Sequence, residues 1–207
     1  MAADGGDAVA LPISSALSGT YESAMIAAAD FPGRVRVVDT LSVTLGAQIQ
    51  ARYALSLAAQ GRSMDEVADA VEAVKGRVHL IALLDTLEYL KRGGRISGAA
   101  ALAGGILSIK PVITIRDGAV ALIGKARGSK NGNNLLSQMV EKYGVDFSMP
   151  YMLGYTGLND TMLQKYKADS ARLWVGHADD LPSMIIGSVV GTHAGPGAIG
   201  VAFFGNE

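Results

Sequence analysis

Residues 13–24 read Ile-Ser-Ser-Ala-Leu-Ser-Gly-Thr-Tyr-Glu-Ser-Ala, which places hydroxyl side chains and a glycine between two apolar segments. We predict a short strand over residues 8–13 and a helix over residues 21–29. A turn of this kind directs small hydrogen-bond donors and the electropositive end of a helix at one point. The turn therefore predicts a site for an anionic group. Simple capping of the helix by the same residue types is the alternative.

The segments after this serine turn predict a parallel sheet covered by helices. An apolar strand is expected over residues 35–39 and a long helix over residues 43–60. Ser63 and Glu66 form a capping box that opens a helix ending near residue 75. This order is typical of α/β proteins. Two strands are too few for a stable covered sheet, so we expect another chain, or a longer form of this protein, to supply more.

The pattern changes after Arg77 to hairpins mixed with helices, which indicates an α+β unit with a mixed sheet. We therefore divide the chain into a partial α/β domain, residues 1–77, and an α+β domain, residues 78–207. The second domain is expected to contain strands at 79–84, 112–115, 119–123, 151–155, 172–175 and 199–204, and helices at 86–92, 97–107, 134–143 and 160–168.

Composition excludes several classes of function. Hydrophobic residues make up 49% and charged residues 18%, which is typical of a globular protein rather than a disordered one. The net charge of -1 gives no electrostatic case for a nucleic-acid partner. The absence of cysteine excludes thiolate catalysis and Cys-ligated zinc, and the histidines lack metal-ligand spacing. We expect no metal and no cofactor.

Targeting signals are also not expected. Residues 1–7 lack the basic and apolar regions of a signal peptide. The longest low-charge run, residues 96–109, is too short for the roughly 20 residues that a bilayer crossing needs. The sequence therefore predicts a cytoplasmic protein with no integral membrane segment.

Several motifs together carry a family resemblance. They are Ile-Ser-Ser-Ala-Leu-Ser-Gly-Thr-Tyr at 13–21, Leu-Glu-Tyr-Leu-Lys-Arg-Gly-Gly-Arg-Ile at 87–96, Ile-Lys-Pro-Val at 109–112, Asp-Gly at 117–118 and His-Ala-Gly-Pro-Gly-Ala at 193–198. Each motif is weak alone, but in this order they resemble the DegV family of bacterial fatty-acid-binding proteins. The resemblance covers the chain from about Asp7 onward.

The resemblance implies a two-domain DegV-like (EDD) fold that holds one long-chain fatty acid in a tunnel between the domains. The carboxylate is expected near the serine turn and the acyl chain in the C-terminal domain. It also implies a non-enzymatic carrier, which in some members presents the acid to an ATP-dependent fatty acid kinase that makes acyl phosphate. The family's N-terminal segment, with a Thr-Ser-Gln-Pro-Ser-like loop that also contacts the carboxylate, has no match here.

Candidate ligand-binding residues follow from the turn and from the resemblance. The turn offers hydroxyl and backbone N–H donors, and the resemblance favours Ser15 as the direct ligand. The family pattern also places an arginine and a histidine near the carboxylate, at Arg127 and His193. The simpler interpretation of Arg127 is a solvated charge at a strand end, and that of His193 is a hydrogen-bonded histidine in a turn. The candidate ligand set is Ser14, Ser15, Ser18, Gly19, Thr20, Arg127 and His193.

Other residues have both a structural and a functional interpretation. Lys91, Arg92 and Arg95 either neutralise a helix C-terminus or form a docking patch for the kinase. Asp39 is expected to tie a loop rather than to act in catalysis. Four methionines could line an acyl tunnel, but core packing is the expected role of most of them: Met139, Met149, Met152 and Met184.

The sequence is also compatible with two other functions. One is a serine-dependent acyl hydrolase or transferase that uses Ser15 or Ser18 as nucleophile together with His193 and an aspartate. The turn lacks the Gly-x-Ser-x-Gly elbow that such enzymes use. The other is a phosphate- or nucleotide-binding module, although no Walker A sequence is present.

Overall fold

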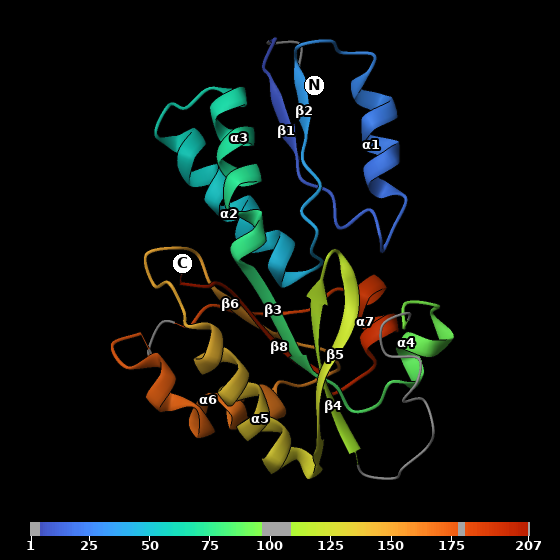
Figure 1. Cartoon of the computed structure of the whole chain (residues 1–207), viewed down its shortest axis with the longest axis vertical. Helices are drawn as coiled ribbons and strands as arrows, with labels where there is room; N and C mark the ends of the chain where they lie inside the picture. The colour runs from blue at the N-terminus through green and yellow to red at the C-terminus, as the bar shows by residue number, and fades with distance from the viewer. Residues whose placement is uncertain (1–4, 97–108, 178–180, 207) are drawn as a thin grey trace.

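The computed structural model describes residues 5–96, 109–177 and 181–206. Figure 1 shows an elongated molecule with a small two-stranded sheet at one end and a six-stranded sheet at the other. Helix α2, Leu45–Ala59, runs from the first part to the second and packs against strands of the larger sheet. The two parts therefore share an apolar interface.

The N-terminal part confirms the predicted order of elements. Strands β1, Ala8–Ala10, and β2, Val35–Val37, pair in parallel and are shorter than predicted. Helix α1, Thr20–Ala28, follows the serine turn. The capping box opens helix α3, Met64–Val74, because Ser63 Oγ accepts from the Glu66 N–H at 3.3 Å and the Glu66 carboxylate accepts from the Ser63 N–H at 2.9 Å. A short 3-10 turn, Lys75–Arg77, then leads into the larger sheet.

The larger sheet is mixed, with strand order β5-β4-β3-β8-β6-β7. All neighbouring strands are antiparallel except β6 and β7. The strands are β3, Val78–Leu83; β4, Ile109–Arg116; β5, Ala119–Arg127; β6, Met152–Tyr155; β7, Ser183–Ile185; and β8, Ile199–Phe204. The predicted hairpin is confirmed, since Asp117 and Gly118 both have positive φ, as a tight turn of this type requires.

The alternation of side chains along β3 creates two different faces of the sheet. Ile81 and Leu83 point to the face that packs on helices α5, Gly128–Tyr143, and α6, Thr161–Asp169. Leu80 and Ala82 point to the opposite face. That second face is covered by α2, by α4, Glu88–Arg92, and by α7, Ser188–Ala194. The candidate site lies on this second face.

Some expectations differ from the structure. The strand predicted at 172–175 is wrong, because Ala171–Trp174 is a 3-10 helix that buries Trp174 and bonds its indole N–H to Ser170 Oγ at 3.1 Å. Helix α7 and strand β7 were not predicted. The helix expected at 97–107 lies outside the described residues. The domain boundary at Arg77 stays a prediction.

Candidate functional site

The backbone of the serine turn is held by Ser14. This residue is fully buried, and its N–H donates to the Ser42 carbonyl at 2.8 Å. Its carbonyl accepts from the N–H groups of Leu17 and Ser18, and its hydroxyl accepts from the Ala16 N–H at 3.2 Å. The side chain of Ser14 is therefore used to shape the turn.

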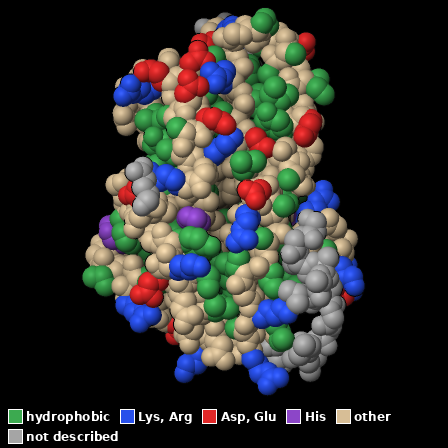
Figure 2. All heavy atoms as spheres, in the orientation of Figure 1, with side chains coloured by type: hydrophobic (Ala, Val, Ile, Leu, Met, Phe, Trp, Pro, Cys, Tyr) green, Lys and Arg blue, Asp and Glu red, His purple; other side chains and the backbone are tan. Residues whose placement is uncertain are grey.

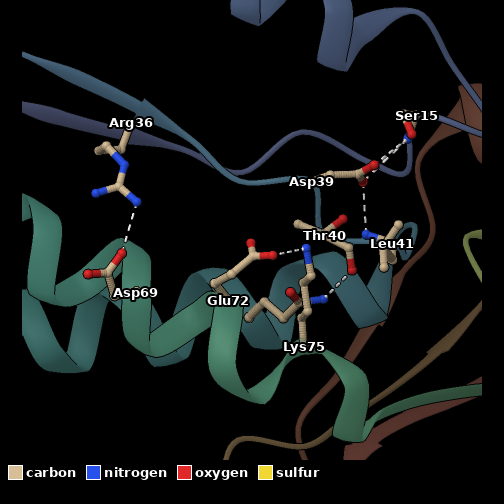
Figure 3. A network of polar contacts seen from close by, with 9 residues as sticks. Ser15, Arg36, Asp39, Thr40, Leu41, Asp69, Glu72 and Lys75 are labelled. Carbon is tan, nitrogen blue, oxygen red and sulfur yellow. Dashed lines mark hydrogen bonds and ion pairs between the residues drawn. The ribbon is translucent and has the colours of Figure 1, made fainter.

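The next residue, Ser15, is held by a carboxylate. Its N–H donates to both oxygens of Asp39, each at 3.3 Å, and the N–H of Leu41 donates to the same carboxylate at 2.9 Å. Figure 3 shows the Asp39 side chain pointing between these two backbone segments. Leu41 has a φ of 46°, so the carboxylate holds a strained loop beside the turn. The predicted loop-tying role of Asp39 is confirmed.

The end of the turn presents hydroxyls at the start of α1. Ser18 Oγ and Thr20 Oγ1 are 2.7 Å apart, and Ser18 Oγ also accepts from the Thr20 N–H at 3.3 Å. Gly19 is the N-cap residue, and both Gly19 and Thr20 are exposed. Within the predicted turn set, Ser18 is the member that lines the cavity described next.

An apolar cavity of about 190 Å³ lies between the serine turn and the larger sheet. Its floor is formed by β3, β4, β5 and β8, and its cover by the turn, the start of α2, α4 and α7. The apolar walls include Ile13, Leu17, Val43, Leu80, Ala82, Leu84, Leu90, Ile113, Ile115, Val120, Ile186, Val189, Val190, Ala194, Ala198 and Ile199. The four methionines considered above are absent from this lining, and they pack in the two hydrophobic clusters of the sheet instead.

The polar side chains of the lining come from distant parts of the sequence. They are Ser18, Thr44, Arg95, Thr114 and His193. Arg95 Nε donates to the carbonyl of Leu17 at 3.1 Å, which fixes the guanidinium beside the serine turn. Thr44, the N-cap residue of α2, has a φ of 45° and a ψ of −117°, an unusual conformation for a threonine.

His193 and Arg95 meet at the backbone of Gly93. The Arg95 guanidinium donates to the Gly93 carbonyl at 2.9 Å through Nη1. The His193 imidazole packs directly on Gly93, and its Nδ1 is buried with no hydrogen-bond partner among the described residues. Arg95 binds the carbonyl of Leu17, which directly precedes Ser18, and it also binds the carbonyl of Gly93, on which His193 packs. Ser18, Arg95 and His193 therefore lie around one edge of the cavity.

The structure does not bring Arg127 to this edge. Arg127 is exposed at the far end of β5, whereas the hairpin tip at the other end of that strand contacts Ser14. A strand from Ala119 to Arg127 at about 3.3 Å per residue separates its ends by more than 20 Å. Arg95, predicted as part of the docking patch, lines the cavity instead. The position of Arg95 directly after the Gly93-Gly94 pair does not predict a location at the cavity.

The other two residues of the predicted docking patch lie on α4. Arg92 forms an ion pair with Glu88 at 2.5 Å, and Lys91 is exposed. On the face drawn in Figure 2, acidic and basic side chains are intermixed.

Among the described residues there is no cluster of His, Asp and Glu that could hold a metal ion. None of the described helices combines the length and hydropathy that crossing a bilayer requires.

Comparisons with known proteins agree with this architecture. The family model described as "Uncharacterised protein, DegV family" matches residues 1–206. A DegV domain-containing protein of Deinococcus radiodurans is 39% identical over 199 residues, covering 95% of this chain and 69% of the relative. A solved DegV family protein from Thermus thermophilus, described by its fatty acid binding, has a TM-score of 0.81 and 31% identity over 97% of this chain and 71% of that one.

A second solved structure supports the same assignment. A DegV lipid-binding protein from Thermotoga maritima has a TM-score of 0.75 and 25% identity, covering 96% of this chain and 69% of that one. The predicted DegV-like fold is therefore confirmed. With the match of the family model along almost the whole sequence, this chain belongs to the DegV family.

Proposed function

We propose that this chain binds a long-chain fatty acid in the cavity below the serine turn. The observation that carries the proposal is an apolar cavity whose polar groups include Ser18, Arg95 and His193 along one edge. The acyl chain would lie on the sheet face, and the carboxylate would lie at that edge. Fatty acid binding by the Thermus relative supports the same ligand class.

The energetics favour such an arrangement. Each buried methylene contributes about 0.8 kcal/mol, so a dozen contribute on the order of 10 kcal/mol before costs. Burying the carboxylate without partners would cancel much of this gain. A guanidinium and hydroxyl donors at the edge avoid that penalty, because hydrogen bonds to charged groups are the stronger ones. The site therefore needs donors rather than catalytic groups.

The geometry favours binding over serine hydrolysis. A hydrolase needs a carboxylate at His193 Nδ1 to orient the imidazole, and this nitrogen has no hydrogen-bond partner among the described residues. The Asp39 carboxylate at the serine turn accepts from Ser15 and Leu41 backbone N–H groups instead. Ser15 is also absent from the cavity lining, although its hydroxyl remains a candidate ligand at the turn.

Native and denaturing mass spectrometry of the purified protein, loaded with palmitate, tests the proposal. The wild type should retain one palmitate. Arg95→Gln should lower retention about tenfold or more, since a charged hydrogen bond contributes about 1.5–3 kcal/mol. Arg127→Gln is the matched control, because Arg127 is exposed like Arg95 but lies outside the lining. Absence of bound acid in the loaded wild type would overturn the proposal.

We infer further that the loaded protein delivers its acid to a separate ATP-dependent kinase. The resemblance supports this step, and Lys91 and Arg92 offer cations on α4, beside the proposed carboxylate edge. Lys91→Glu with Arg92→Glu should lower acyl phosphate formation and make it less sensitive to salt. Lys130→Glu with Lys142→Glu, two exposed lysines on α5, is the control. Equal yields from both pairs would remove the docking role of α4.

A further inference from the structure

Gly93 is a glycine for a reason other than backbone conformation. Its φ of −77° and ψ of −3° are right-handed helical values that any residue adopts. The next residue, Gly94, has a φ of +69° and needs glycine for its conformation. Backbone conformation therefore does not explain the glycine at position 93.

The His193 side chain occupies the space that a side chain at position 93 would need. A Cβ added at Gly93 would lie 2.0 Å from His193 Nδ1 and 2.5 Å from Cε1. A reciprocal contact lies nearby, between a glycine after α7 and a ring of α4: a Cβ at Gly195 would lie 2.3 Å from a ring carbon of Tyr89. The His193 ring of α7 therefore packs on Gly93 after α4, and the Tyr89 ring of α4 packs on Gly195 after α7. These two contacts join α4 to α7.

The same contact determines which edge of the imidazole faces Gly93. The Nδ1–Cε1 edge lies against the Gly93 backbone, and Nδ1 is buried without a partner among the described residues. A proton on Nδ1 would have no acceptor there, whereas a lone pair can accept a weak Cα–H contact from the glycine. This packing favours the tautomer that carries its proton on Nε2.

We propose that Gly93 is a positioning residue that fixes the orientation and tautomer of His193, so that its Nε2–H is the donor available at the cavity edge. The Gly93 carbonyl also holds Arg95 Nη1 at 2.9 Å, so one backbone unit arranges both groups. The consequence for ligand binding rests on the proposed fatty acid function. The positioning itself depends only on the contact between α4 and α7.

A double-mutant cycle with two readouts tests this inference on the full chain. The variants are Gly93→Ala, His193→Ala and the double variant, with Gly76→Ala as control because nothing lies within 4 Å of an added Cβ there. Gly93→Ala should change the ¹⁵N NMR pattern of the His193 imidazole and lower palmitate retention at least tenfold. In the His193→Ala background it should lower the unfolding midpoint no more than Gly76→Ala does.

The outcomes separate the two proposals. Unchanged His193 ¹⁵N shifts in Gly93→Ala, or an equal loss of stability in both backgrounds, would overturn the positioning role. If the wild type takes up no palmitate while the cycle remains coupled and the ¹⁵N pattern still changes, the positioning role stands and the fatty acid function fails. The double variant keeps the test valid if Gly93→Ala alone does not fold.

Discussion

The hairpin tip at Gly118 rests directly on the buried hydroxyl of Ser14, where an added Cβ would lie 2.4 Å from Ser14 Oγ. These residues are more than a hundred positions apart in the sequence. Their contact joins the β4–β5 hairpin to the serine turn. The tip needs glycine both for its φ of +77° and for this close approach.

Gly118→Ala should therefore destabilise the protein more than an ordinary left-handed glycine substitution does. The matched control is Gly33→Ala, because Gly33 has a φ of +74° and open space around it. The control should cost about 1–2 kcal/mol for the backbone conformation. Gly118→Ala should cost about 1–3 kcal/mol more, because the new methyl overpacks Ser14. Equal free energies of unfolding in urea would show that the contact with Ser14 is not tight.

The loop held by Asp39 gives a second prediction. Asp39→Ala leaves the N–H groups of Ser15 and Leu41 without their acceptor and should lower the free energy of unfolding by about 1.5–3 kcal/mol. Asp39→Asn keeps one acceptor oxygen and should cost less. Asp30→Ala removes an exposed carboxylate and serves as the control. If chemical denaturation gives the same loss for Asp39→Ala and Asp30→Ala, the carboxylate does not tie the loop.

Elements with strong local signals could be predicted from the sequence. The capping box of Ser63 and Glu66 and the Asp117-Gly118 hairpin are both set by residues within a few positions of one another. The prediction of a strand near Trp174 is wrong, because a short apolar run can be buried equally well in a turn. Periodicity carries no information on that choice.

The site could be predicted only in part, because it is assembled by long-range packing. Ser18 and His193 belong to the predicted ligand-binding set, and both line the cavity. The placement of Arg95 depends on its bonds to Leu17 and Gly93, and no spacing rule reveals the first of these. The distance of Arg127 from the turn follows from the length of β5, which continues well past the predicted strand end.

The cavity itself gives a third prediction. Ala82 lines its floor on β3, so Ala82→Leu should fill space that the acyl chain needs. Displacing two methylenes costs about 1.6 kcal/mol, or roughly tenfold in palmitate affinity. Ala121→Leu, on β5 and outside the lining, is the control. Palmitate titration of delipidated protein measures the effect, and identical affinities for both variants would place the ligand elsewhere.

Burial of His79 gives a fourth prediction, on the pH dependence of stability. Its imidazole stacks on Tyr143 with ring centroids 4.1 Å apart and lies 5.4 Å from the Phe203 ring. Burial lowers the pKa of His79 below its ordinary value, because the charged form is poorly solvated there. As the pH falls below about 6.5, the unfolded chain binds a proton that the folded protein resists, so stability should decrease.

The expected slope stays below the single-proton limit of about 1.4 kcal/mol per pH unit. Urea unfolding between about pH 7.5 and 5.5 measures it. His79→Phe keeps an aromatic ring against Tyr143 and removes the titrating group, so its stability should vary less over this range. Tyr143→Phe keeps the stacked ring and His79 and should retain the wild-type slope. If His79→Phe and the wild type lose stability in parallel, the pH dependence arises from other groups, because only the titration of His79 separates the two proteins in this range.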